Sequence, residues 1–394
     1  TEQAGDVPPR VALTAPTGKA AARLQEAVAR ATAQLPPADR ARVGPASAAT
    51  LHRLLGSRPD TRTRFRHHRE NRLPHDIVVV DETSMVSLTM MARLVEAVRP
   101  DARLILVGDP DQLASVEAGA VLADLVAGLG SGPTVTALRT SHRFGARIGA
   151  LAAAVRDGDA DRAWTVLTEG GDEVELVDAG DPRATEVVRA VAVSSALAVH
   201  AAAEAGDADA AVAAMERHRL LCAHRDGPHG AAYWNRQVER WLGEAVGTPV
   251  GQAWGREWYA GRPLLVTAND YGLGLYNGDT GVVVRAGDGL RAVVAGVGRH
   301  RVLALSRLAE VDTLHAMTVH KSQGSQAEEV TVLLPEEDSR LLSRELFYTA
   351  VTRARAKVRV VATEESVRAA VTRRARRASG LRWRLTAGEP ATPP

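Results

Sequence analysis

The chain of 394 residues is poor in several residue types, and each shortage narrows the range of possible functions. Its single cysteine, Cys222, excludes an internal disulfide framework and is typical of a reducing, cytoplasmic compartment. Because Cys222 lies in the apolar run 220–223, we predict a buried structural thiol. No apolar run approaches the ~20 residues that a membrane-spanning helix needs, and no signal peptide is visible. We therefore expect a cytoplasmic protein.

Aromatic residues and lysines are also scarce. Aromatic residues make up 4% of the chain, so stacking platforms for bases are few and backbone contacts would dominate any binding of nucleic acid. Only three of the 49 basic residues are lysines, namely Lys19, Lys321 and Lys357. In a chain that otherwise uses arginine, a lysine indicates a site that needs a compact point charge. The net charge is only +2, but arginines concentrate in 58–72 and 353–384, which favours local contacts to phosphates.

The sequence also has no phosphate-binding loop of the pattern G-x-x-x-x-G-K-[ST]. Its nearest match has Leu13 where the glycine is required and Ala20 where the hydroxyl is required. Because the chain starts at Thr1 without a methionine, we expect that the N-terminal part of a longer protein is missing.

What the chain does have is a run of apolar β-branched residues, 77–80, that ends in Asp81 and Glu82. Such a run is typical of a buried strand of a parallel sheet, and ligands bind beyond the carboxyl ends of such strands. Adjacent carboxylates there suit nucleotide hydrolysis, in which one holds Mg²⁺ and the next orients or deprotonates water. A solvated acidic turn is the commoner explanation of such a pair taken alone. A second predicted buried strand, 103–107, is followed by Gly-Asp-Pro-Asp-Gln at 108–112, and this favours the nucleotide site.

The remaining sequence alternates between helical and extended patterns. We predict a basic hairpin or arm at about 56–75, a further short element at 135–138, and an alanine-rich helical region at 146–217. Short β runs separated by glycine turns follow an Asn-Gly turn at 277–278 and indicate a small barrel of the SH3 type. Near the end we predict a helix at 344–355, a strand at 357–361 and a frayed tail after Arg373.

Taken in order, the motifs closely resemble those of superfamily-1 DNA helicases of the RecD-like group, the alpha subunit of exodeoxyribonuclease V. Each motif is a modest signal, but their order is specific, and the resemblance covers about 11–362. The motifs are TAPTGKAA (14–21), TLH (50–52), DE (81–82), GDPDQ (108–112), SHRF (141–144), VHKSQGSQ (319–326) and YTAVTRAR (348–355).

The resemblance implies an α/β fold of two RecA-like parallel-sheet domains, the helicase form of the P-loop NTPase fold. The first domain would span 1–133, be incomplete because the phosphate loop is absent, and carry the hairpin insertion at about 56–75. The second would span 134–394 and include the helical segment 146–217 and an SH3-like insertion at about 277–312.

The resemblance also implies a role for each matching residue. Asp81 would hold Mg²⁺, Glu82 would be the catalytic base, Gln112 would sense the γ-phosphate, and Arg143 and Arg353 would contact it, with Arg353 as the arginine finger. On the predicted helix Arg353 shares a face with Thr349. An arginine finger accelerates phosphoryl transfer by a factor of ~10³–10⁵. The alternative role of Arg353, an ion pair with a surface acid, would contribute under about 1 kcal/mol. Nucleotide contacts are further implied for Asp109 and Gly324. Contacts to the DNA strand are implied for Thr14, Thr17, Lys19, Thr50, His52, His320, Lys321, Ser322 and Gln323.

The function implied is an ATP-dependent DNA helicase or translocase, moving 5′→3′, that acts in DNA recombination and double-strand-break repair. Because the phosphate loop is absent, these 394 residues alone are predicted to have negligible ATPase activity, and DNA-stimulated ATP turnover by them would contradict that prediction. Its cofactors would be ATP and Mg²⁺, and its partners would be single-stranded or unwound DNA and the beta and gamma subunits of exodeoxyribonuclease V. Two alternatives stay open: a shortened, non-catalytic nucleic-acid-binding subunit, and the helicase domain of a conjugative relaxase. The sequence upstream of residue 1 would discriminate among the three.

Overall fold

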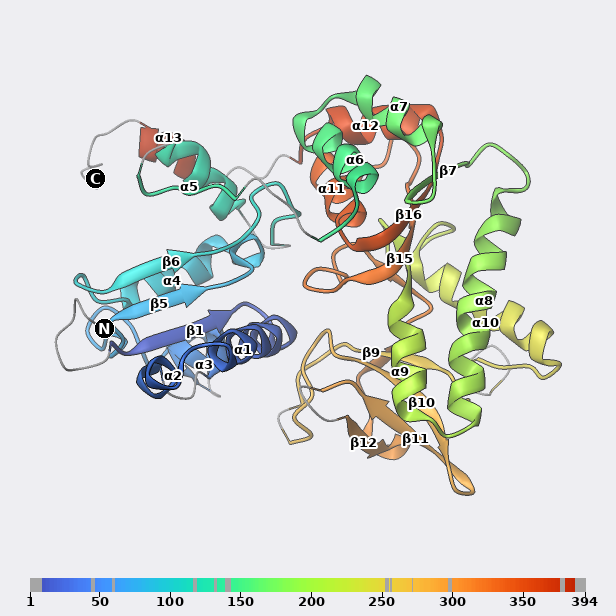
Figure 1. Cartoon of the computed structure of the whole chain (residues 1–394), viewed down its shortest axis with the longest axis horizontal. Helices are drawn as coiled ribbons and strands as arrows, with labels where there is room; N and C mark the ends of the chain where they lie inside the picture. The colour runs from blue at the N-terminus through green and yellow to red at the C-terminus, as the bar shows by residue number, and fades with distance from the viewer. Residues whose placement is uncertain are drawn as a thin grey trace. The chain divides into compact units, whose positions relative to one another are not determined.

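The computed structural model describes residues 9–43, 47–58, 61–115, 119–130, 133–138, 143–251, 255, 257–270, 272–296, 300–375 and 380–386 (Figure 1). The chain divides into two compact units, each with its own sheet. Unit 1 comprises Thr1–Ala137 and Arg376–Pro394, and unit 2 comprises Leu138–Ala375. The predicted short element at 135–138 is wrong, because these residues form no helix or strand and Leu138 is 94% exposed.

Unit 1 is built on a four-stranded parallel sheet with the strand order β2-β1-β5-β6. Its core includes Leu55, Val78, Val80 and Leu94, all of which are fully buried. The elements of unit 1 are β1 Val11–Ala15, α1 Gly18–Ala33, α2 Pro37–Val43, β2 Ala48–Thr50, α3 Leu51–Leu55, β3 Ser57–Arg58, β4 Thr61–Phe65, β5 Ile77–Val80, the 3₁₀ helix η1 Thr83–Met85, α4 Leu88–Ala97, β6 Arg103–Leu106, α5 Val121–Leu129 and α13 Leu381–Thr386.

Three features of unit 1 bear on the predictions. The strand at 103–107 was expected to be buried, but Ile105 and Val107 are 39% and 46% exposed. The reason is that β6 is the last strand of the described sheet, so it has a strand neighbour on one side only. The expected frayed tail is wrong for 381–386, which form α13 and pack on α5, where Leu385 lies against Gly128. Within the predicted basic hairpin, β3 and β4 pair antiparallel.

Unit 2 contains a five-stranded parallel sheet, β14-β8-β15-β16-β7, and a five-stranded antiparallel sheet, β12-β11-β10-β9-β13. The elements of unit 2 are α6 Ala146–Asp157, α7 Ala160–Glu169, β7 Val174–Asp178, α8 Ala184–Glu204, α9 Ala208–Arg217, β8 His218–Cys222, α10 Ala231–Val246, β9 Pro263–Val266, β10 Thr280–Ala286, β11 Gly289–Val294, β12 Arg301–Ala304, the 3₁₀ helix η3 Leu305–Arg307, β13 Val311–Thr313, β14 Ala316–Thr318, β15 Ala327–Leu333, α11 Arg344–Val351, β16 Ala354–Ala362 and α12 Glu364–Thr372.

The antiparallel sheet, which we call the small sheet (β9 to β13), is docked on helices α8 and α9. Arg285 of β10 makes two bonds to the Glu204 carboxylate at the end of α8, at 2.6 and 3.0 Å. Helix α8 is long and apolar enough, by length and composition only, to cross a membrane. Within unit 2 it packs against α9, α10 and β10.

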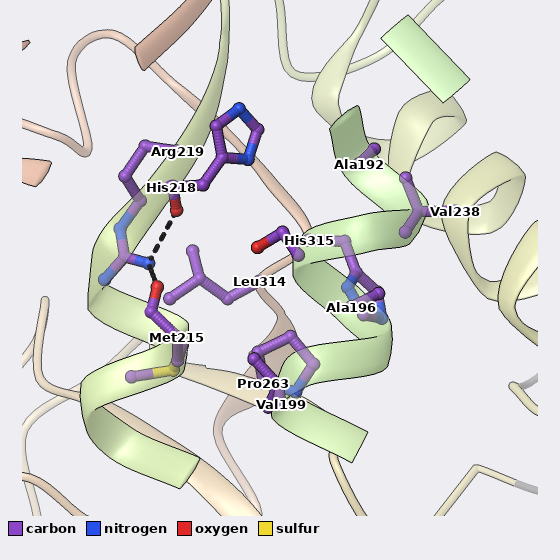
Figure 2. A pocket seen from close by; sticks show the side chains of 11 residues that line it. Ala192, Ala196, Val199, Met215, His218, Arg219, Val238, Pro263, Leu314 and His315 are labelled. Atoms are coloured by element: carbon purple, nitrogen blue, oxygen red, sulfur yellow. Dashed lines mark hydrogen bonds between the residues drawn. The ribbon is translucent and has the colours of Figure 1, made fainter. Parts of the chain in front are cut away.

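Beside α8, unit 2 contains a small, partly open pocket of about 20 Å³, large enough for one water molecule (Figure 2). The side chains of His218 and His315 line it together with apolar groups of α8 and α10. Burial is the main reason that the pKa of each of these histidines is lowered to about 3. Both are therefore neutral near pH 7.

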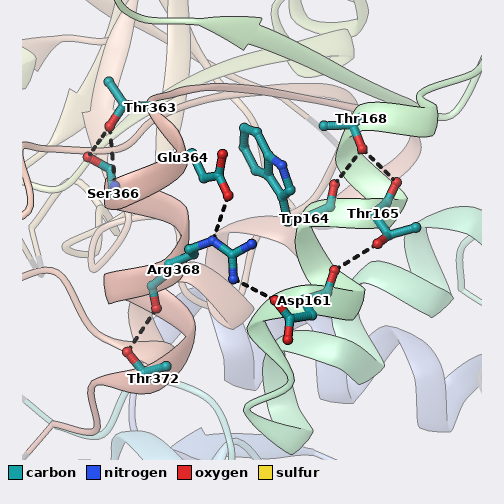
Figure 3. Close-up of polar contacts among 9 residues, drawn as sticks. All are labelled: Asp161, Trp164, Thr165, Thr168, Thr363, Glu364, Ser366, Arg368 and Thr372. Carbon is teal, nitrogen blue, oxygen red and sulfur yellow. Dashed lines mark hydrogen bonds and ion pairs between the residues drawn. The ribbon is translucent and has the colours of Figure 1, made fainter.

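Polar contacts also fix the last helix of unit 2. Arg368 of α12 bonds Glu364 in its own helix and Asp161 at the start of α7, each at 2.7 Å (Figure 3). The prediction of a helix over 344–355 is wrong at its end, because α11 stops at Val351 and β16 begins at Ala354. Arg353 therefore lies in the turn between them and not on a helix face.

Candidate nucleotide site and strand contacts

The predicted acids of unit 1 lie at the carboxyl ends of two adjacent parallel strands, β5 and β6. Backbone bonds tie these two ends together. The Thr83 amide donates to the Val107 carbonyl at 2.9 Å, and the Ser115 amide donates to the Ser84 carbonyl at 3.2 Å. The Asp81 amide donates to the Thr14 carbonyl at 2.8 Å, which adds the end of β1 to the same edge.

Glu82 has a strained backbone. Its φ of 49° and ψ of 41° put it in the left-handed region, and it is the one non-glycine residue with positive φ among the described residues. Its amide donates to Oδ1 of Asp81 at 2.8 Å, which holds the two acids in a fixed relation. Such a conformation costs of order 1–3 kcal/mol and is found most often at functional sites. The strain is therefore consistent with a catalytic task for this residue.

After β6, Asp109 organises the turn that carries Gln112. Its Oδ2 accepts from Nε2 of Gln112 at 3.0 Å, and its Oδ1 accepts from the Asp111 amide at 3.1 Å. The Gln112 side chain is thereby held in one orientation, and the residue is buried. Gly108 has no room for a side chain, because an added Cβ would lie 2.8 Å from Leu122 and 3.0 Å from the Thr83 amide nitrogen.

The residues at this edge fit a magnesium–nucleotide complex. Mg²⁺ prefers oxygen ligands, and proteins commonly hold it by one or two carboxylates together with phosphate oxygens. Asp81 and Asp109 supply carboxylates at neighbouring strand ends. Oγ of Ser84 is buried and has no hydrogen-bond partner among the described residues, as expected for a group left for a ligand. The described residues contain no cluster of three or more His, Cys, Asp or Glu that could hold a metal alone.

In unit 2, Arg353 is 3% exposed and its guanidinium is bonded inside the unit. Nε donates to the Thr349 carbonyl at 3.1 Å, Nη1 to the Ser325 carbonyl at 3.3 Å, and Nη2 to Oγ1 of Thr352 at 3.4 Å. The side chain thus ties the end of α11 to the turn that contains Gly324, whose φ is +68°. Arg143 is exposed, whereas Ser141 and His142 of the same motif lie outside the described residues.

Several hydroxyls among the predicted strand contacts hold local structure. Thr17 and Thr50 cap the first turns of α1 and α3, where their oxygens accept from backbone amides at 3.2 Å. Thr14 and Ser322 are buried, and their hydroxyls donate to the carbonyls of Ala49 and Val319. These bonds fix the local backbone of the motifs.

Among the other predicted strand contacts, His52 and Lys321 are exposed, and Lys19, His320 and Gln323 are half-buried. Nζ of Lys321 donates to Oδ1 of Asn277 in the small sheet at 3.0 Å. Neither Asn277 nor Ser84 was predicted from the sequence as a site residue. Asn277 was recognised only as part of a hairpin turn, and nothing in the local sequence of Ser84 predicts an unpaired hydroxyl.

Cys222 is fully buried, which confirms the prediction of a buried thiol. Burial raises the pKa of this thiol to about 12, so it stays protonated and unreactive near neutral pH.

Comparison with known proteins identifies the family. A family model described as an AAA domain matches residues 1–179, and one described as a UvrD-like helicase C-terminal domain matches 313–361. The chain is 65% identical to the RecBCD enzyme subunit RecD of Mycolicibacterium smegmatis, over 97% of this chain and 67% of that protein. The chain belongs to the RecD-like family of superfamily-1 helicases. It spans about two thirds of the length of that RecD relative.

Two more distant matches were also found. The ATP-dependent RecD2 DNA helicase of Deinococcus radiodurans is 33% identical over 88% of this chain and 42% of that protein. A crystal structure of the Pif1 helicase from Bacteroides in complex with ADP-AlF3 and ssDNA is 15% identical, covering 93% of this chain and 92% of that chain with a TM-score of 0.46. That structural likeness is too low to inform the site, so the assignment depends on the RecD relatives.

Proposed function

We propose that this RecD-family chain is the motor part of an ATP-dependent DNA helicase that moves along a single strand. The observation that carries the proposal is the convergence of Asp81, Glu82, Asp109 and Gln112 at the carboxyl ends of β5 and β6. In parallel α/β sheets this edge is where ligands bind. The left-handed backbone of Glu82 and the unpartnered Ser84 hydroxyl add support from geometry and hydrogen bonding.

In this proposal each unit 1 residue has a separate task. Asp81 holds the magnesium ion, which when bound neutralises charge on the phosphates. Glu82 orients and deprotonates the attacking water, and Gln112 senses the γ-phosphate through its amide, whose orientation Asp109 fixes. General-base catalysis of this kind contributes typically ~10²–10⁴ in rate.

The free edge of β6 indicates how the phosphate loop is supplied. In the part of the chain that the structure describes, β6 has one strand neighbour, and Ile105 is partly exposed. Strands of parallel sheets are usually buried on both faces, so the 39% exposure of Ile105 is unusual for such a strand. We propose that a further parallel strand pairs with β6 and delivers the phosphate loop beside Asp109. The 394 residues alone therefore remain predicted to be ATPase-deficient.

Two arginines of unit 2 complete the proposed nucleotide contacts. Arg143 is exposed, and Arg353 would act as the finger once its bonds to the carbonyls of Thr349 and Ser325 exchange for bonds to the γ-phosphate. Those carbonyls are neutral acceptors, and a phosphate oxygen is a stronger, charged acceptor for a guanidinium. The exchange is thus favoured only while the γ-phosphate is present. A contact that is made with ATP bound and lost after hydrolysis can shift the balance between two conformations.

The DNA-contacting residues are proposed as a set on both units. Lys19, His52, His320, Lys321 and Gln323 present side chains, while Thr17 and Thr50 fix the turns that present them. We further propose 5′→3′ movement, an SH3-type small sheet, work in DNA repair and recombination with the beta and gamma subunits of exodeoxyribonuclease V, and a cytoplasmic location. These points rest on membership of the RecD-like family.

The test is Glu82→Gln in the protein that contains this chain and its upstream sequence. We expect DNA-stimulated ATP turnover to fall by at least about 10²-fold, with the affinities for ATP and single-stranded DNA unchanged. Glu96→Gln is the matched control, because Glu96 lies on α4 in an exposed ion pair with Arg93. Turnover that survives in Glu82→Gln refutes the role of Glu82. Absence of DNA-stimulated turnover in the unmodified protein would favour the non-catalytic alternative.

A further inference from the structure

Lys321 is held by a residue from a different sheet. It lies in the turn after β14, and its Nζ donates to Oδ1 of Asn277 at 3.0 Å. Asn277 belongs to the connection between β9 and β10 of the small sheet, 44 residues earlier in the chain. Both residues belong to unit 2. The small sheet therefore contacts one of the lysines that the motifs place on the DNA strand.

The turn that carries Asn277 is fixed by several hydrogen bonds. The Asn277 amide donates to Oδ1 of Asn269, and the Tyr276 amide donates to Oδ2 of Asp279, both at 2.9 Å. The Gly278 amide donates to the Val266 carbonyl at 2.9 Å, and its φ of +94° favours glycine at this position. Oδ1 of Asn277 is therefore a preorganised acceptor, and it restricts a side chain that otherwise has four rotatable bonds.

The charges around Lys321 leave its ammonium able to take an anion. Although Lys321 is exposed by its accessible surface, partial desolvation of its ammonium group by the surrounding protein lowers its pKa, Asp312 on β13 opposes that effect, and Arg225 adds to it. Arg225 and Asp312 themselves form an exposed ion pair at 3.8 Å. The partner that holds Nζ, the Asn277 amide, is neutral. A phosphate oxygen is a charged acceptor, and it gives a shorter and stronger bond to an ammonium group.

We propose that Asn277 is a positioning residue, which holds the Lys321 ammonium where one phosphate of the DNA strand binds. The small sheet then contributes to binding of the DNA strand through the Asn277 side chain. The inference rests on the proposed function, because it takes Lys321 as a strand contact. It goes beyond the motifs, since Asn277 lies in none of them.

A thermodynamic cycle tests the proposal. The binding of a fluorescein-labelled oligo(dT) to the full-length protein is measured by anisotropy over a range of salt, for wild type, Asn277→Ala, Lys321→Ala and the double variant. Loss of one phosphate contact lowers the slope of log K against log salt by about 0.7 for a single strand. We expect this change for Lys321→Ala. For Asn277→Ala we expect binding about 3- to 10-fold weaker, because one long side chain must then be ordered on binding.

The double variant and a charged variant make the test specific. If Asn277 acts through Lys321, the double variant binds as Lys321→Ala alone. Asn277→Asp keeps an acceptor at the turn but pairs the ammonium with a carboxylate, so its salt slope should fall as in Lys321→Ala. Asp288→Ala, in the exposed turn between β10 and β11, is the control and should keep the wild-type slope. Thermal melting of every variant verifies that it folds.

The outcomes distinguish a failure of the Lys321 assignment from a failure of the positioning role of Asn277. If Lys321→Ala binds with wild-type affinity and slope, the assignment of Lys321 in the proposed function is wrong. If Lys321→Ala weakens binding but Asn277→Ala and Asn277→Asp do not, the positioning role is overturned and the proposed function stands. Additive effects in the double variant would also overturn it, because they mean that Asn277 acts independently of Lys321.

Discussion

Replacing Arg353 should destabilise unit 2 as well as remove the proposed arginine finger. The guanidinium is 3% exposed and donates to two carbonyls and one hydroxyl at 3.1 to 3.4 Å. Hydrogen bonds to charged groups contribute ≈ 1.5–3 kcal/mol each, but the three here are long and share one side chain, so we expect Arg353→Ala to cost about 3 kcal/mol. For a unit of this size that corresponds to a melting temperature lower by about 6–12 °C.

The measurement is thermal unfolding of wild type, Arg353→Ala and Arg353→Lys, alongside DNA-stimulated ATPase at a temperature where all three are folded. Lysine can keep one charged bond to a carbonyl but lacks the planar fork, so Arg353→Lys should melt between the other two and still lose most turnover. A finger contributes ~10³–10⁵ in rate. An Arg353→Ala protein that melts within 2 °C (roughly 1 kcal/mol or less) of wild type would refute the structural role. Turnover retained in Arg353→Lys would refute the finger.

Two further predictions concern stability. Gly108→Ala should destabilise unit 1 by about 1–3 kcal/mol, because the new Cβ would lie 2.8 Å from Leu122 and 3.0 Å from the Thr83 amide. Gly149→Ala in α6, where the nearest atoms are 3.6 Å away, should instead stabilise unit 2 by about 0.5–1 kcal/mol. Equal shifts of the melting temperature for the two variants would contradict the packing argument. The folded pKa values of His218 and His315 are lowered to about 3, so the unfolded chain binds more protons and stability falls as pH drops from 6.5 towards 3. At pH 5 each histidine costs about 2 kcal/mol. Denaturant unfolding of wild type and His315→Gln at pH 7 and 5 should show a smaller loss in the variant, and parallel losses would exclude His315 as a source.

The strand ends that carry the site were predictable because they depend on local patterns. A β-branched run that stops at two acids, and a strand followed by a glycine turn, place Asp81 and Asp109 without knowledge of the partners. The predictions that failed concern features that depend on which strands lie next to one another in the fold. Helical propensity continues past Val351, but the residues from Ala354 pair in register with β15, and that pairing overrides it. The exposure of Ile105 likewise depends on which strand lies beside β6, and no pattern within 103–107 carries that information.

The turn 319–326 joins the two tasks that we propose for unit 2. At one point Lys321 reaches the small sheet through Asn277, and four residues later the Ser325 carbonyl accepts from Arg353. Between them Gly324, at φ +68°, gives a backbone conformation that a larger residue would resist. In the proposed function Arg353 exchanges its bond to the Ser325 carbonyl for one to the γ-phosphate, so nucleotide binding would release this turn at one end. A turn held at one end by the proposed finger and at the other by the proposed strand lysine would be an element whose equilibrium both ligands can bias, which is the physical requirement for coupling ATP turnover to movement on DNA.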